Sequence, residues 1–219
     1  MLPTMRSARI LFLMPVFVLI FTRIGIEICA RLLPMHLSWI PAFGIYYFSI
    51  EICLWFAKSR FGLIVSSKGT SLLPLPNIKL IALGIIIPAL IPLGVFISNY
   101  KAVPPIDFVY IIVFASINPF FEEAFWRGLF RNLPITPPKL QLLSGFLFSF
   151  SHYFLWGSYW LSNPKVLIPT CITTFIMGWC WMWFYQKDGR LIYPVLSHII
   201  VDMFNLSIAI FMGLKLVNT

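Results

Sequence analysis

Acidic residues and histidines are scarce in this sequence, and five that lie inside strongly apolar stretches could do chemistry. The 219 residues include only seven Asp and Glu and three His. A charged group at the centre of a bilayer costs about 2.5 to 3.5 kcal/mol on insertion scales, so several in a small chain need a reason. Buried carboxylates and imidazoles either pair with one another or exchange protons with a reactant. The five residues are Glu122, Glu123, His152, His198 and Asp202.

The stretch FFEEAFWRGLF places two adjacent carboxylates and a guanidinium among apolar residues. Glu123 and Arg127 are four residues apart, the spacing of an ion pair on one helix face. Glu122 and Arg127 are five apart, which rotates them roughly 140° from one another on a helix. We therefore predict that Glu123 pairs with Arg127 and that Glu122 faces a different neighbour.

The imidazoles follow the same four-residue spacing. Phe148 and His152 share a helix face, and so do His198 and Asp202. At a rise of about 1.5 Å per residue, Glu122, His152 and His198 lie about 16, 20 and 12 Å from the proposed cytoplasmic ends of their helices, at Leu133, Lys139 and Arg190. Three helices thus bring ionisable groups to similar depths, which favours one shared cavity.

The composition predicts the elements that position these groups. The chain is 60% hydrophobic, 17% aromatic and only 11% charged, outside the range of soluble domains. A spanning helix needs about 20 mainly apolar residues. We predict an all-α, polytopic transmembrane bundle of about seven helices, with six to eight allowed, forming a single domain over residues 1–219 with a motif-bearing core at about 107–214. The predicted spans are 10–33, 37–57, 78–98, 107–133, 140–157, 166–186 and 191–214.

The net charge of +9 comes from basic residues spread over short connections, which indicates membrane orientation rather than nucleic-acid binding. Most of these residues fall on the cytoplasmic side if the N-terminus is cytoplasmic. Arg6 and Arg9 precede an apolar run as in a signal peptide, but no small-x-small cleavage site follows, so we expect a retained first helix. We expect the cytoplasmic membrane in a prokaryote and the endoplasmic reticulum in a eukaryote. The four cysteines form no CxxC pair and are interpreted as packing residues.

Taken together, three motifs are specific. The run Pro119-x-x-Glu122-Glu123-x-x-x-Arg127-Gly128 is followed by Phe148-x-x-x-His152 and then by His198-x-x-x-Asp202. In this order, each on a predicted helix, they resemble the CPBP family of intramembrane glutamic proteases, which includes the CAAX prenyl endopeptidases and bacteriocin-processing or self-immunity relatives. The resemblance covers about residues 118–205, and the first three helices match only as hydrophobic spans.

The resemblance implies a hydrolase that cuts a peptide bond in a membrane cavity, with a water activated by a glutamate and no covalent intermediate. By motif position, Glu122 is the catalytic glutamate, His152 helps to activate the water, and His198 with Asp202 stabilises the oxyanion. Glu123, Arg127 and Phe148 are supporting residues. Many members have Asn where this chain has Asp202. Because an ionised Asp would repel an oxyanion, we expect Asp202 either to be protonated or, preferably, to accept a hydrogen bond from His198 and fix its tautomer.

Three alternatives remain open on the sequence. One is a non-catalytic immunity or scaffold protein of the same fold, and another is a transporter that uses buried carboxylates as a proton relay. The third is a zinc-dependent version of the protease, since two Glu, two His and an Asp can ligate zinc. We expect no cofactor, because the sequence lacks HExxH and Glu122 with His152 suffices to activate water. The expected partners are the bilayer and a peptide or protein substrate in or at the membrane, lipidated or not.

Overall fold

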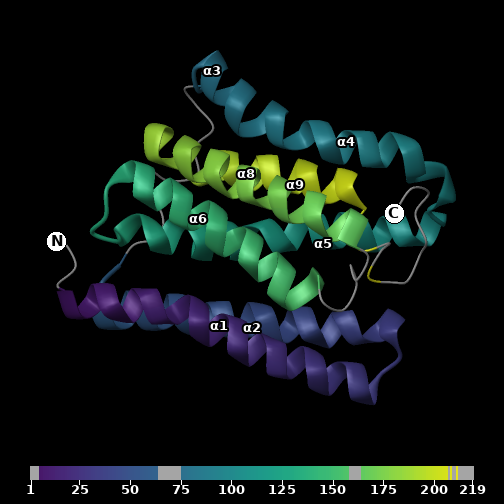
Figure 1. The fold of residues 1–219 in the computed structure, drawn as a ribbon, viewed down its shortest axis with the longest axis horizontal. Coiled ribbons are helices and arrows are strands. Elements are labelled where there is room, and N and C mark those ends of the chain that lie inside the picture. The colour runs from purple at the N-terminus through teal and green to yellow at the C-terminus, as the bar shows by residue number, and fades with distance from the viewer. Residues whose placement is uncertain (1–4, 64–74, 158–163, 207, 209–210, 212–219) are drawn as a thin grey trace.

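The structure is a computed structural model that describes residues 5–63, 75–157, 164–206, 208 and 211. Within these ranges all regular elements are helical, so the all-α prediction is confirmed (Figure 1). The described helices form seven continuous rods at the positions of the seven predicted spans. The predicted extension of the last span beyond residue 206 falls largely outside the described residues.

Three rods change helix type along their length. The other four are α-helical throughout: α1 (Met5–Leu32), α2 (Met35–Phe61), α8 (Pro164–Asp188) and α9 (Ile192–Asn205). The third rod joins α3 (Ile78–Ile81) to α4 (Ile87–Asn99) through a π-helical segment, η1 (Ala82–Ile86). In the fourth, α5 (Pro105–Glu123) is followed by a π-helical segment, η3 (Ala124–Leu129), and a 3₁₀ turn, η4 (Phe130–Asn132). In the fifth, α6 (Pro137–Ser151) continues as a π-helical segment, η5 (His152–Gly157).

Five described segments are long and apolar enough to cross a membrane. They are Ala8–Leu32, His36–Phe61, Ile78–Ala102, Pro105–Asn132 and Leu167–Asp188. Large apolar side chains on their outer faces are open to the surroundings, among them Leu13, Ile24 and Ile91, each more than half exposed. A soluble monomer rarely exposes such continuous apolar surface, whereas lipid tolerates it. The chain is a multi-pass integral membrane protein.

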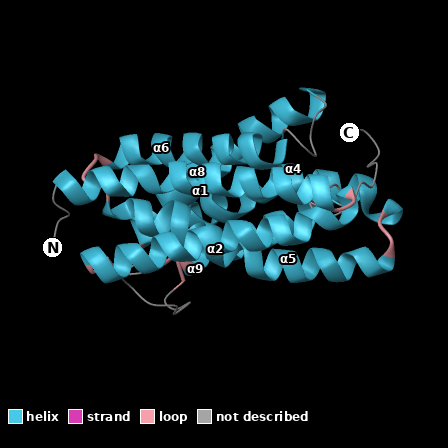
Figure 2. Cartoon of the chain, turned by 90° about the horizontal axis from the view of Figure 1, so that it is seen from below, coloured by secondary structure: helices cyan, strands magenta, loops and turns pink. Residues whose placement is uncertain are grey.

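The helix axes are roughly aligned with one another, as Figure 2 shows from below. In Figure 1 the α1–α2 pair lies on one side, the α3–α4 rod on the other, and α5, α6, α8 and α9 between them. The closest neighbours are α1 with α2, α6 with α8, and α9 with both α4 and α5. The helices that carry the candidate site therefore occupy the middle of the bundle.

Two glycines allow α6 and α8 to approach closely. A Cβ atom on Gly178 would lie 2.9 Å from the Cα of Gly145 and 3.1 Å from the Cβ of Phe148. A Cβ atom on Gly145 would lie 2.8 Å from the carbonyl oxygen of Phe175. Since real Cβ atoms do not approach so closely, glycine at both positions sets the distance between the two helices.

A contact from α1 reaches the π-helical segment that begins at His152. Arg23 Nη2 lies 3.0 Å from Glu27 Oε1, the four-residue pair that the sequence allows. Arg23 Nη1 also donates to the carbonyl oxygen of Phe154 at 2.8 Å. This hydrogen bond fastens η5, whose wider helical turns leave backbone groups shifted from the α-helical pattern, to the first helix.

Candidate active site

A cavity of about 310 Å³ lies in the middle of the bundle and gathers the predicted residues. Glu122 from α5, His152 from η5, and His198 and Asp202 from α9 all line it. The remaining wall is mostly apolar and includes Phe43, Ile91, Pro92, Val95, Phe114 and Trp156. The expected convergence of three helices on one cavity is confirmed, while the catalytic roles of the four residues remain predictions.

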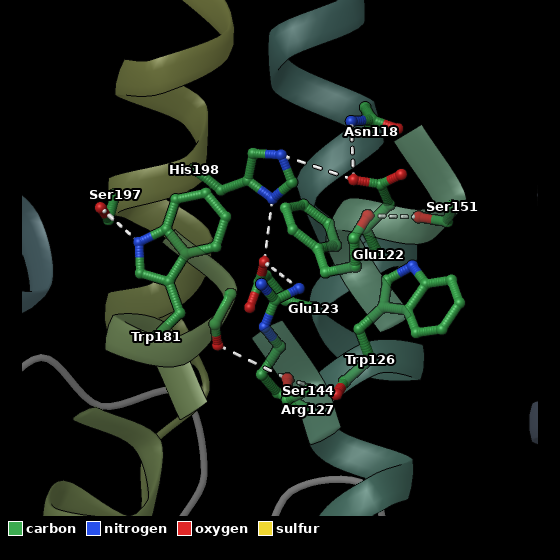
Figure 3. A network of polar contacts seen from close by, with 12 residues as sticks. Asn118, Glu122, Glu123, Trp126, Arg127, Ser144, Ser151, Trp181, Ser197 and His198 are labelled. Atoms are coloured by element: carbon green, nitrogen blue, oxygen red, sulfur yellow. Dashed lines mark hydrogen bonds and ion pairs between the residues drawn. The ribbon is translucent and has the colours of Figure 1, made fainter. Parts of the chain in front are cut away.

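His198 lies between carboxylates on both of its ring nitrogens (Figure 3). Its Nδ1 donates to Glu123 Oε1 at 2.9 Å. Its Nε2 lies 3.5 Å from Glu122 Oε2 and 3.5 Å from Asp202 Oδ1. The Trp181 ring stacks on the imidazole with centroids 4.5 Å apart. These contacts fix both the plane and the rotation of the ring.

The shortest carboxylate contact of His198 is not with Asp202, the residue that the sequence predicts to fix its tautomer. The Asp202 carboxylate lies 3.5 Å from Nε2. Glu123 makes the short contact, at Nδ1. The reason is that Glu123, at the end of α5, approaches the ring from the opposite side to the carboxylate one turn along α9. Glu123 therefore serves two partners, His198 and Arg127.

Glu123 and Arg127 form the predicted ion pair. Arg127 Nη1 lies 3.1 Å from Glu123 Oε1, and both side chains are fully buried. The guanidinium carbon lies 4.2 Å from the ring centroid of Phe148 and 5.0 Å from that of Trp181. Cations attract the faces of aromatic rings, so the two rings partly replace water around the guanidinium. The pair holds although the residues after Glu123 form a π-helical segment, a feature that recurs at functional sites.

Glu122 faces away from this ion pair, as its helical angle predicts. The Tyr46 hydroxyl donates to Glu122 Oε1 at 2.8 Å, and Trp126 Nε1 donates in turn to that hydroxyl at 3.0 Å. Asn118 Nδ2 lies 3.4 Å from the other carboxylate oxygen, Oε2. One oxygen is therefore held by α2, while the other is directed toward Asn118 and His198.

His152 lies on the cavity wall with its tautomer set by its own helix. Its Nδ1 is 2.8 Å from the carbonyl oxygen of Phe148, and since a carbonyl only accepts, Nδ1 carries the hydrogen. In the neutral ring Nε2 is then the acceptor. Phe148 packs against the imidazole with centroids 4.4 Å apart, as its spacing predicts. His152 and Glu122 both line the cavity, and no hydrogen bond between them is found among the described residues.

Several residues of the site were not predicted from the sequence. Tyr46 and Tyr47 lie in α2, within a predicted span that resembles the family only as a hydrophobic stretch, and Asn118 lies one turn before Glu122. Trp126 and Trp181 orient the groups around them through indole hydrogen bonds to Tyr46 and Ser197. An amide four residues before a buried glutamate was a pattern that could have identified Asn118. Nothing in the spacing connects α2 to a glutamate 76 residues away.

The zinc alternative requires several metal-ligating side chains grouped around one point. In the part of the chain that the structure describes, no three His, Cys, Asp or Glu side chains are grouped as metal ligands. Hydrolysis without a metal remains a prediction.

Residues 104–204 match the model of a protein family described as type II CAAX prenyl endopeptidase Rce1-like. The motif-bearing segment is similar to this family. The match agrees with the resemblance seen in the motifs and runs from the start of α5 to the end of α9. It contains every candidate catalytic and supporting residue predicted from the motifs, while α1 to α4, with Tyr46 and Tyr47, lie outside it. Comparison with curated proteins gave no match, and comparison with solved structures gave none either.

Proposed function

We propose that the protein is an intramembrane endopeptidase that hydrolyses a peptide bond with a water activated by Glu122. The observation that carries the proposal is the cavity of about 310 Å³, in which Glu122, His152, His198 and Asp202 lie together. Peptide hydrolysis needs a base for the water and a donor for the developing oxyanion. The family match to CAAX prenyl endopeptidases supports the same reaction class.

Glu122 acts as the base. With Oε1 held by Tyr46, its Oε2 takes a proton from a water that lies in the cavity, and the acceptor nitrogen of His152 orients that water. The hydroxide attacks the scissile carbonyl carbon and forms a tetrahedral intermediate. Glu122 then returns the proton to the leaving amine, so the carboxylate is regenerated and no covalent enzyme intermediate forms.

His198 acts as the oxyanion donor. In the imidazolium form it donates from both nitrogens: Nδ1 to Glu123 and Nε2 toward the cavity. Glu123 in turn is held by Arg127, so the donor is anchored through two buried contacts. Preorganised donors of this kind stabilise the charge that develops in the transition state.

The substrate is a peptide or protein that reaches the cavity from the membrane. The wall formed by Ile91, Pro92 and Val95 on α4 suits an apolar chain or lipid group beside the scissile bond. We assign the N-terminus to the cytoplasm on the distribution of basic residues. The membrane is the cytoplasmic membrane of a prokaryote or the endoplasmic reticulum of a eukaryote.

The proposal is tested by comparing Glu122→Gln with the wild-type protein. Membrane proteins and peptides from cells carrying each are compared by mass spectrometry, and purified protein in liposomes is assayed on the species that differ. We expect a cleaved species that is lost in Glu122→Gln and retained in Glu51→Gln, a matched change at an exposed glutamate of α2. If Glu122→Gln keeps full biological activity, the protein is a scaffold. Ion flux that depends on Glu122 without peptide cleavage would identify a transporter.

A further inference from the structure

The amide of Asn118 lies between the two carboxylates nearest the cavity. Asn118 is 4% exposed and lines the cavity from α5. Its Nδ2 donates to Asp202 Oδ2 at 2.9 Å. The same nitrogen lies 3.4 Å from Glu122 Oε2, a contact that Figure 3 shows. An amide nitrogen carries two hydrogens. Each of them is thus directed at a carboxylate, one on its own helix and one on α9.

The orientation of this amide is set from the other side by α2. The Tyr47 hydroxyl donates to Asn118 Oδ1 at 3.2 Å. With the amide reversed, its oxygen would face two carboxylate oxygens, which offer it no hydrogen while they are ionised. The Tyr47 ring stacks on Phe121 with centroids 4.5 Å apart, which holds the hydroxyl in place. Tyr47, Asn118 and Asp202 therefore form a directed chain of hydrogen bonds from α2 to α9.

The local charges explain why a neutral donor is needed. The Glu123 carboxylate is paired with the Arg127 guanidinium and with Nδ1 of His198. Glu122 and Asp202, in contrast, approach the same nitrogen, Nε2 of His198, at 3.5 Å each. Two carboxylates so close together repel one another, and a donor between them offsets that repulsion.

On the basis of the proposed function, we propose that Asn118 is a positioning residue of the hydrolytic site. Its amide bridges Glu122 and Asp202 and keeps both carboxylates turned toward Nε2 of His198. The base is thereby held beside the oxyanion donor before substrate enters. Holding the base in this position requires both Asn118 and Asp202, because the bridge is lost when either residue is removed.

The first test removes the bridge while keeping the branching of the side chain. In Asn118→Leu, a side chain with the same number of heavy atoms lacks all hydrogen-bonding groups. We expect kcat to fall about 10- to 100-fold, as for lost hydrogen bonds to charged groups, with KM changed less than about threefold. The matched control is Asn99→Leu, a buried asparagine of α4 that bonds only a backbone carbonyl and lies outside the cavity. Its kcat stays within about threefold of the wild-type value.

The second test exchanges the two groups. Asn118→Asp places a carboxylate against Asp202, and we expect kcat to fall about 100-fold or more because two bonds become repulsions. Adding Asp202→Asn restores an amide donor facing a carboxylate, while Tyr47 still finds an acceptor at position 118. We expect the double variant to recover about tenfold over Asn118→Asp, though not fully, since the contact to Glu122 is not restored.

The outcomes separate the inference from the proposed function. Wild-type kcat in Asn118→Leu overturns the positioning role, and so does a folded double variant that is no more active than Asn118→Asp. If the wild-type protein cleaves no peptide, the proposed function fails and thermal unfolding in detergent tests the bridge. The double variant must then unfold at a higher temperature than Asn118→Asp, and equal temperatures overturn the bridge.

Discussion

The hydroxyl of Tyr46 lies 2.8 Å from the Oε1 atom of Glu122, so a residue of α2 holds the candidate catalytic base on α5. The same hydroxyl accepts a hydrogen bond from Trp126 at 3.0 Å. It is therefore fixed as a donor toward the carboxylate, and Glu122 keeps one oxygen for the reactant.

Replacing Tyr46 by Phe removes this donor and keeps the ring. We expect kcat to fall about 10-fold with KM little changed, because a hydrogen bond to a charged group contributes about 1.5 kcal/mol or more. Steady-state cleavage of the substrate identified by the Glu122 comparison measures the effect. Tyr110→Phe, at an exposed tyrosine of α5, is the control. Equal loss in both variants would show that the Tyr46 hydroxyl has no special role.

Replacing Arg127 by Met leaves Glu123 buried without its guanidinium. Breaking a buried ion pair by removing one partner costs about 3 to 5 kcal/mol. We expect the thermal unfolding temperature in detergent to drop and cleavage to be lost, because Glu123 also holds His198. The double change Glu123→Gln with Arg127→Met restores part of the stability and none of the activity. Arg31→Met, at an exposed position of α1, leaves both unchanged.

Replacing Gly178 by Val pushes α8 away from α6. The new side chain meets the Cα of Gly145 and the Cβ of Phe148, and overpacking of this kind costs about 1 to 3 kcal/mol. Phe148 packs on both His152 and Arg127. We therefore expect a loss of kcat even at temperatures at which the variant remains folded. The control is Gly94→Val, where a Cβ meets nothing within 4 Å. If the folded variant keeps the wild-type kcat and only its unfolding temperature drops, Gly178 does not position Phe148 for the reaction.

Removal of metal ions is expected to leave cleavage intact. In the proposed reaction Glu122 provides the base and His152 the orienting group, so no metal ion is needed to activate the water. The purified protein is treated with a strong chelator, its metal content is measured, and its rate is compared with that of untreated protein. Loss of activity that is restored by added zinc would establish the zinc-dependent version instead.

Local spacing predicted a large part of this architecture. Helix angles alone separated Glu123, which faces Arg127, from Glu122, and the four-residue spacing placed Phe148 on His152. These relations depend on a few residues of one helix. The contact of Glu123 with His198 spans 75 residues and depends on how α5 and α9 pack, which no local pattern encodes.

The contributions of α2 were unpredictable for a different reason. Tyr46 and Tyr47 stand among apolar residues, where an aromatic side chain most often faces lipid or core. Their hydroxyls become part of the site only because α2 lies against η3 and α5. Asn118, by contrast, was within reach of the four-residue rule, since its partner Glu122 lies one turn further along the same helix.

The chain positions of these partners also bear on how the protein enters the bilayer during synthesis. Glu123 meets its counter-ion four residues later, within the same rod, so that carboxylate is neutralised while the segment is being inserted. Tyr46 precedes Glu122 by 76 residues and is already in place when the glutamate arrives. The two acids are thus partnered by segments made before or with them, and the histidine that completes the centre, on the last described rod, can join a preassembled half.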